Sequence, residues 1–209
     1  WDLPVWQPVP SVVTIHDAAA LPASRRAYRW RRLAARRAAA VLTNWGTIRD
    51  DLIAQVPLDA RRVEAIPLGL ETRFQPPPPA AVEAVRRRYG LPEGYLFYVG
   101  GLDRQKAPTL LVEVAEAVAR RAPALTLVIA SGDPGAIPAS ARVRHLGYVP
   151  DGDLPALYAG ATVCISTAQW IVPLTLLEAQ ACGTPGLAFN TPSAREVLRS
   201  GAILVPPGD

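Results

Sequence analysis

The chain has 209 residues, half of them hydrophobic, and a formal net charge of +4. This composition can bury a sizeable core in one large or two small domains, and it excludes an intrinsically disordered protein. No apolar run reaches the roughly 18 residues that a membrane-spanning helix needs, and the basic-then-apolar order of a signal peptide is missing, which favours a cytoplasmic protein.

The first third of the chain alternates strand-like and helix-like segments. Short apolar runs predict strands, and longer segments of mixed polarity predict helices. In chain order we expect a strand at residues 11–15, a helix at 24–39, a strand at 40–43, a helix at 47–55 and a strand at 62–66. Because no hairpin signal interrupts this alternation, the predicted fold class is α/β with parallel sheets.

The predicted helix at residues 24–39 is strongly basic. Seven of the 13 residues from 25 to 37 are arginine. With about 100° of rotation per residue, Arg25, Arg29, Arg32 and Arg36 share one stripe of the helix. The stripe is either a solvated face or a surface for peripheral contact with anionic lipid at the inner face of a membrane. No nucleic-acid-binding module accompanies it, so we expect no nucleic-acid partner.

A proline run marks the predicted domain boundary. Gln75 is followed by four consecutive prolines, which favour a stiff polyproline II segment. We therefore expect a first domain at residues 1–74, a linker at 75–80 and a second domain at 81–209.

The second domain continues the alternation of strands and helices. Leu110, Val114 and Val118 fall on one face of a predicted helix. Strands are expected at residues 95–99, 125–130, 143–146, 162–165, 186–189 and 202–205, and helices near 81–89 and beginning near 153, 173 and 193.

The first domain has too few predicted strands to complete a nucleotide-binding sheet, which has about five or six. The second domain stops in a turn at residues 206–209. We therefore expect the first domain to be represented only by its C-terminal part, and the second to lack its C-terminal end.

Candidate site residues follow the predicted strands, because ligands of parallel α/β sheets bind outside the carboxyl ends of the strands. In chain order these candidates are His16, Gly100, Gly101, Lys106, Val149 and Glu178.

Each of the stronger candidates also has a structural interpretation. The paired glycines before Lys106 suit an anion such as a diphosphate, or they form an ordinary tight turn. They match neither the P-loop nor the dinucleotide fingerprint. Glu178 lies among apolar residues, so it either needs a partner within a site or faces solvent. His16 is either a hydrogen-bonded structural residue or a functional one.

Several ordered motifs extend over nearly the whole chain. They read VVTIHD at residues 12–17, DLI at 51–53, IPLGL at 66–70, YVGGLD at 98–103, LGYVPD at 146–151, PLTLLEA at 173–179 and ACGTP at 181–185. In this order they resemble glycosyltransferase family 4, also called glycosyl transferases group 1. The resemblance implies the GT-B fold, in which two Rossmann-like domains provide an acceptor side and a donor side.

The same resemblance implies an activity. Family members are retaining glycosyltransferases that move a sugar from a nucleotide-sugar donor to a hydroxyl group of a glycan, glycolipid or small-molecule acceptor. They need no cofactor and no essential metal. The implied catalytic residues are His16 and Lys106, and the implied donor-binding residues are Gly100, Gly101, Lys106, Val149, Thr175, Leu176 and Glu178.

Within that set, the resemblance gives individual roles. Lys106 pairs with the donor diphosphate, and the backbone around Val149 meets the nucleobase. Glu178 hydrogen-bonds the donor ribose, and His16 reaches the donor sugar. A fixed cation beside the diphosphate stabilises the charge that builds as the glycosidic bond breaks.

Two positions depart from the family pattern. Trp170 stands where members carry the first glutamate of a Glu-x7-Glu motif, and Gly101 stands where many carry a basic residue. An indole cannot accept a hydrogen bond from a sugar hydroxyl. The alternatives are therefore a non-catalytic GT-B-like binding or scaffold protein, or a sugar-nucleotide epimerase of the same architecture.

Overall fold

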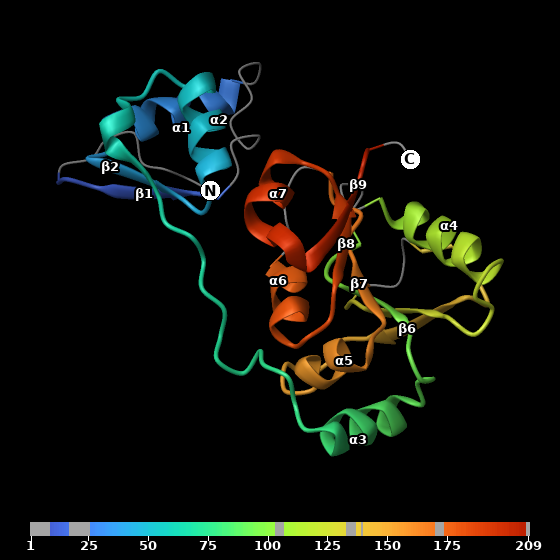
Figure 1. Cartoon of the computed structure of the whole chain (residues 1–209). Helices are drawn as coiled ribbons and strands as arrows, with labels where there is room; N and C mark the ends of the chain where they lie inside the picture. Colours follow the sequence, from blue (N-terminus) through green and yellow to red (C-terminus); the bar gives the residue numbers. More distant parts are fainter. Residues whose placement is uncertain are drawn as a thin grey trace. The chain divides into compact units, whose positions relative to one another are not determined.

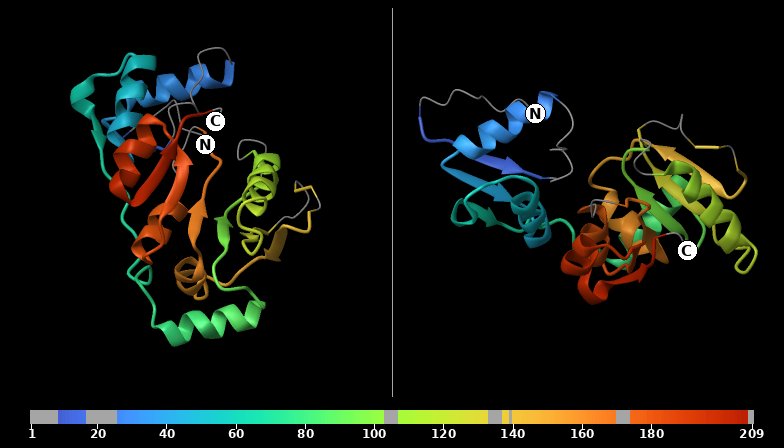
Figure 2. Two further views of the ribbon diagram at one scale, coloured as in Figure 1. Left: turned by 45° about the vertical axis from the view of Figure 1, so that its right-hand side comes forward. Right: turned by 90° about the horizontal axis from the view of Figure 1, so that it is seen from above.

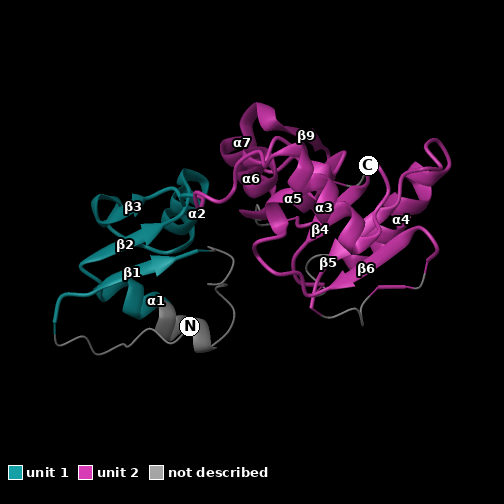
Figure 3. Ribbon diagram, turned by 90° about the horizontal axis from the view of Figure 1, so that it is seen from below, with its two compact units in different colours: residues 1–69 teal, residues 70–209 magenta. Residues whose placement is uncertain are grey.

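The computed structural model describes residues 9–16, 26–102, 107–132, 137–138, 140–169 and 174–207. The chain divides into two compact units, Trp1–Gly69 and Leu70–Asp209 (Figure 3). Both contain parallel sheets with connecting helices, which confirms the predicted α/β class. No helix within the described ranges is both long and apolar enough to cross a bilayer.

The first unit holds a three-stranded parallel sheet in the order β1-β2-β3. Its elements are β1 (Val12–Ile15), α1 (Arg26–Arg37), β2 (Ala40–Thr43), α2 (Gly46–Gln55), the short 3-10 helix η2 (Ala60–Arg62) and β3 (Val63–Ala65). Alternate residues such as Val13, Ile15 and Val41 are buried on one sheet face. Ala34, on α1, and Leu52, on α2, are fully buried as well, as expected where helices cover one face of a sheet.

The second unit holds a six-stranded sheet, and all of its strand pairs are parallel. Figure 1 shows its elements. They are α3 (Pro79–Tyr89), β4 (Leu96–Val99), α4 (Pro108–Ala119), β5 (Leu127–Ala130), β6 (Val143–Gly147), α5 (Leu154–Gly160), β7 (Val163–Ile165), α6 (Leu174–Ala181), β8 (Gly186–Phe189), α7 (Pro192–Leu198), η4 (Arg199–Gly201) and β9 (Ala202–Val205). Every strand begins and ends within two residues of the predicted bounds.

Two apolar cores lie on opposite faces of this sheet. On one face Phe97 of β4 and Val128 of β5 pack with residues of α5, α6 and α7. On the other, Leu96 and Tyr98 of β4 pack against α4. Figure 2 shows α4 on one side of the strands and α5, α6 and α7 on the other. Successive strand residues thus point to opposite cores, as the period of two requires.

The most buried residues of α4 are offset by one position from the apolar stripe seen in the sequence. Leu111, Ala115 and Ala119 are buried, whereas Val114 and Val118 are only partly buried at the edge of the core. The reason is size: two alanines, four residues apart, let the helix lie close to the sheet. Counting large side chains alone favoured the neighbouring face.

The boundary between the units lies earlier than the proline run. Contacts separate the chain after Gly69, so the segment that follows belongs to the second unit. Phe74 is 8% exposed, and its ring lies 6.1 Å from that of Tyr158 in an edge-to-face arrangement. Pro79 begins α3, where proline is well tolerated because the first helical turn needs no N–H donor. Pro78, with φ −56° and ψ 142°, keeps the expected polyproline II geometry.

Candidate functional site

The strand order of the second unit defines where a ligand would bind. The order β6-β5-β4-β7-β8-β9 runs outward in both directions from β4 and β7. It is the doubly wound order of nucleotide-binding sheets, whose crevice lies at the carboxyl ends of the two central strands. The residues directly after β4 and directly after β7 therefore flank this crevice.

A cavity of about 310 Å³ lies at this edge of the sheet. It is lined by residues 99–102 after β4, 130–132 after β5, and 147–149 with Asp151 and Leu154 after β6. The predicted donor-binding residues Gly100, Gly101 and Val149 all line it. Four of its twelve described lining residues are glycines, so a ligand can approach the backbone closely at those points.

Two of these glycines adopt conformations that other residues rarely take. Gly147 has φ 74°, and no atom lies within 4 Å of the position a Cβ would occupy. Gly100 has φ 136°, and its N–H donates to the carbonyl oxygen of Ala130 at 3.1 Å. The Tyr98 hydroxyl donates to the carbonyl oxygen of Gly101 at 2.6 Å and so stabilises the same turn. The backbone is thus fixed where a ligand can approach it closely.

Glu178 is half-buried on α6 and does not lie on a solvated helix face. The Tyr158 hydroxyl donates to its Oε2 atom at 2.7 Å. Burial raises the pKa of the Glu178 carboxyl, while the hydrogen bond from Tyr158 and the charge of Arg73 act in the opposite direction. The partner that a buried carboxylate needs is therefore a tyrosine of the neighbouring helix α5.

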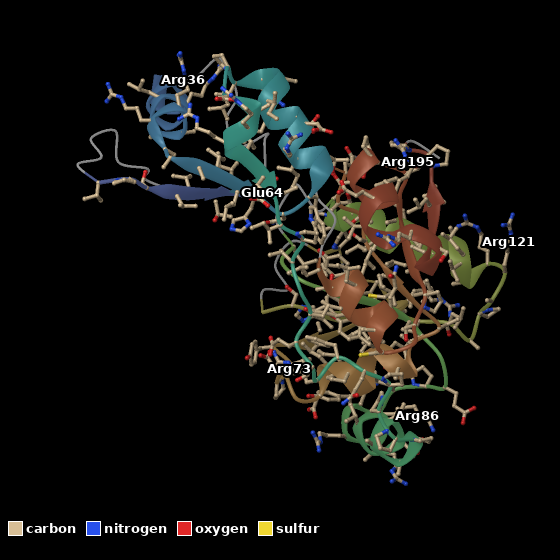
Figure 4. All side chains as sticks on the ribbon, turned by 60° about the vertical axis from the view of Figure 1, so that its left-hand side comes forward. Arg36, Glu64, Arg73, Arg86, Arg121 and Arg195 are labelled. Carbon is tan, nitrogen blue, oxygen red and sulfur yellow. The ribbon has the colours of Figure 1, made fainter. Side chains whose placement is uncertain are left out.

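Arg73 connects the surroundings of Glu178 with the cavity. Its guanidinium lies 2.7 Å from Glu71 and 3.3 Å from Asp151, which lines the cavity. It also lies 5.3 Å from the centre of the Phe74 ring. Figure 4 labels Arg73 among the side chains. The cavity and Glu178 thus share one group of charged neighbours.

The raised pKa of Glu178 predicts a specific pH dependence of stability. The folded protein holds the Glu178 proton more tightly than the unfolded chain, whose carboxyl titrates near the ordinary value of 4.5. The free energy of unfolding therefore falls as the pH rises from that value through the raised pKa. We expect Glu178→Gln to be more stable than the wild type at pH 7, and the difference to vanish as the pH falls below about 4.

Urea unfolding of both proteins between pH 4 and pH 8 measures this difference. Glu113→Gln, at an exposed position of α4, is the matched control and should give no pH-dependent difference. A Glu178→Gln protein less stable than the wild type at pH 7 would contradict the expectation.

His16 lies in the first unit at the end of β1, where the sequence placed it. Its side chain is exposed, and Nδ1 lies 2.8 Å from Oδ1 of Asn44. Because an amide oxygen only accepts, Nδ1 is the donor in this contact. The histidine is thus oriented by a hydrogen bond and also accessible.

The remaining predicted site residues fall in two groups. Leu176 is fully buried in the core and Thr175 is half-buried, so Leu176 offers a ligand only its backbone, in the first turn of α6. Lys106, Trp170 and Arg25 lie outside the described residues.

Only part of the arginine stripe is described at the level of side chains, namely Arg32 and Arg36. The Arg32 guanidinium donates to the carbonyl oxygen of Gln55, the last residue of α2, so it caps that helix. Arg36 is exposed (Figure 4). Arg32 thus makes a structural contact, whereas Arg36 is accessible to solvent or to an anionic surface.

Sequence reasoning missed the roles of Tyr158 and Arg73. A tyrosine among the apolar residues of a short helix needs a hydrogen-bond partner for its hydroxyl, and a glutamate among apolar residues needs one for its carboxylate. The two residues could therefore have been recognised in the sequence as possible partners of each other. Arg73 lies in an irregular segment before the prolines, where no periodicity predicts a direction.

Comparisons with known proteins agree with this geometry. A family model described as Glycosyl transferases group 1 matches residues 93–209, and one described as Glycosyltransferase Family 4 matches residues 2–74. The D-inositol 3-phosphate glycosyltransferase of Salinispora tropica is 36% identical over 173 residues, which cover 71% of this chain and 36% of that protein. The O-antigen chain mannosyltransferase B of Escherichia coli is 28% identical over 182 residues, covering 81% of this chain and 48% of that protein.

Among solved structures, Anabaena HepE in complex with UDP-glucose is similar with a TM-score of 0.80 and 22% identity, covering 96% of this chain and 59% of that one. The parallel sheets and the crevice of the second unit are those of the GT-B class. The chain belongs to glycosyltransferase family 4, the glycosyl transferases group 1. It spans between about a third and a half of the length of the two curated relatives.

Proposed function

We propose that this chain belongs to a retaining glycosyltransferase, and that its second unit binds a nucleoside diphosphate sugar. The observation that carries the proposal is the cavity at the carboxyl ends of β4, β5 and β6, whose lining residue Asp151 lies close enough to the half-buried Glu178 to influence its pKa. A nucleotide needs both features, because its base and phosphates suit backbone groups while its ribose hydroxyls need an acceptor.

The proposed roles follow the chemistry of transfer. The bond from the anomeric carbon to the diphosphate oxygen breaks, and the leaving nucleoside diphosphate gains negative charge. Lys106 stabilises this charge, the glycine turn at Gly100 and Gly101 admits the phosphates, and Glu178 accepts from the ribose. His16 acts on the donor sugar. The oxygen of a hydroxyl group on a glycan, glycolipid or small-molecule acceptor bonds to the anomeric carbon, and the hydroxyl proton passes to the leaving diphosphate. A cytoplasmic location, with peripheral membrane contact through the exposed Arg36, belongs to the same proposal.

Trp170 supports a second candidate, a non-catalytic nucleotide-sugar-binding protein of the same fold. It occupies the position where the family pattern has a glutamate, and an indole can stack on a sugar but cannot accept a hydrogen bond from it. Release of nucleoside diphosphate by the full-length protein in the presence of hydroxyl acceptors supports the transferase. Binding of the donor without such release supports the second candidate.

The first test is a calorimetric titration with UDP, GDP, ADP and their sugars. We expect saturable binding of one nucleotide, and a dissociation constant about 10- to 100-fold higher in Lys106→Ala, because a charge-assisted contact with the diphosphate contributes about 1.5–3 kcal/mol. Arg121→Ala removes the same charge from an exposed position near the C-terminal end of α4 and should bind normally.

Lys106 also permits a direct measurement, since it is the only lysine of the chain. An amine-reactive reagent should label it in the free protein, and the bound nucleotide should protect it. Absence of binding by a folded protein, or equal affinity in wild type and Lys106→Ala, would refute the proposed site.

A further inference from the structure

The ring, the backbone and the hydroxyl group of Tyr158 are all held by contacts. Tyr158 is fully buried, and its ring makes edge-to-face contacts with Phe97 at 5.5 Å and Phe74 at 6.1 Å. Its carbonyl oxygen accepts a hydrogen bond from the Thr184 hydroxyl at 2.6 Å. Because ring and backbone are both held, the position of the phenolic hydroxyl is fixed, and so is the Glu178 oxygen that it contacts.

A second buried tyrosine in the same core provides a comparison. Tyr95 is 1% exposed, contacts Phe97 edge-to-face at 5.8 Å, and donates its hydroxyl to the carbonyl oxygen of Leu157 at 2.7 Å. A backbone carbonyl therefore satisfies a buried tyrosine in this environment. Tyr158 instead donates to the carboxylate of Glu178, which is only half-buried. If the Tyr158 hydroxyl served only to satisfy its hydrogen bond within the core, a backbone carbonyl would suffice, as it does for Tyr95.

The orientation of a glutamate matters for binding because its side chain is flexible. A free side chain must be ordered when it binds a ligand, and this ordering costs about 0.5–1.5 kcal/mol. A hydrogen bond that already fixes one carboxylate oxygen removes most of that cost and leaves the other oxygen as an acceptor with a defined direction.

We propose that Tyr158 is a positioning residue: it holds Oε2 of Glu178 so that Oε1 accepts hydrogen bonds from the ribose hydroxyls of the nucleotide donor. The inference rests on the proposed function of Glu178 and adds the element that makes Glu178 selective for ribose. Phe74 and Phe97 keep the ring in place, and Thr184 holds the backbone of α5 at the same residue.

The test measures discrimination between ribose and its 2′,3′-dideoxy analogue. The dissociation constants of the nucleoside diphosphate that binds the wild type and of its dideoxy form are determined for the full-length protein. Their ratio reports the contact with the ribose hydroxyls. We expect Tyr158→Phe to lower this ratio about 3- to 10-fold, corresponding to the ordering cost of one side chain.

Tyr95→Phe is the matched control, since it removes the same hydroxyl from the same core. Both variants should lower the melting temperature by similar amounts, and only Tyr158→Phe should change the ratio. In the Glu178→Ala background, Tyr158→Phe should produce no further loss of discrimination, because its effect passes through Glu178.

The outcomes separate this inference from the proposed function. If Glu178→Ala abolishes discrimination while Tyr158→Phe, shown to be folded by its melting transition, leaves it unchanged, the positioning role is refuted and the donor site stands. If Glu178→Ala also leaves discrimination unchanged, Glu178 does not contact the ribose, and both proposals are overturned.

Discussion

Replacing Glu178 with alanine is expected to weaken nucleotide binding about 10- to 100-fold. The reason is the loss of a charged acceptor for the ribose hydroxyls, and hydrogen bonds to charged groups contribute about 1.5–3 kcal/mol each. Calorimetry with the nucleoside diphosphate measures the change. Glu113→Ala, at an exposed position of α4, removes the same charge at another site and should bind as the wild type does.

The alanine variant also removes the acceptor of the buried Tyr158 hydroxyl, so affinity and stability must be measured separately. An unsatisfied buried donor costs about 1–3 kcal/mol, and we expect a lower melting temperature as well as weaker binding. Glu178→Gln keeps an acceptor for Tyr158 and removes only the charge. Unchanged affinity in a folded Glu178→Ala protein would contradict the assignment of Glu178 to the donor site.

Replacing Phe97 with alanine is expected to lower the free energy of unfolding of the second unit by about 3–5 kcal/mol. Phe97 is fully buried on β4, a central strand, and its ring contacts those of Tyr95 and Tyr158. Removing it leaves a cavity between the sheet and α5. Since the total stability of a domain is about 5–15 kcal/mol, much of the second unit should be unfolded in mild denaturant.

Urea unfolding gives the size of this effect, and hydrogen exchange of peptides from each unit locates it. Tyr148→Ala is the control, because Tyr148 is 78% exposed and its removal should change stability by less than about 0.5 kcal/mol. If Phe97→Ala lowered the free energy of unfolding by less than about 1 kcal/mol, the side chains between β4 and α5 would have to repack and fill the cavity.

The sequence predicted the strands well for a physical reason. In a parallel sheet covered on both faces, strands are short apolar runs bounded by turns, and the runs LFYV at residues 96–99 and LVIA at 127–130 are of this kind. The rule that ligands bind at the carboxyl ends then placed Gly100, Gly101 and Val149 correctly around the cavity. The most buried positions of α4 include two alanines, Ala115 and Ala119. A pattern based on large apolar residues does not identify such positions.

Contacts between distant residues were beyond sequence reasoning. Tyr158 and Glu178 are 20 residues apart on different helices, and only the crossing of α5 and α6 brings their side chains together. Arg73 and Asp151 are 78 residues apart, and neither lies within a periodic element that predicts a direction. Charges and hydrogen bonds of this kind depend on the assembled fold, whereas strand position depends on local composition.

The early boundary between the units has a practical consequence for dissecting the protein. A recombinant donor domain designed from the proline run would begin near residue 81 and would lack Arg73 and Phe74. The Tyr158 ring would then lose its edge-to-face contact with Phe74. Tyr158 is the residue whose hydroxyl donates to Glu178, the carboxylate proposed to bind the ribose. An excised domain should therefore start at Leu70, where the contacts of the second unit begin.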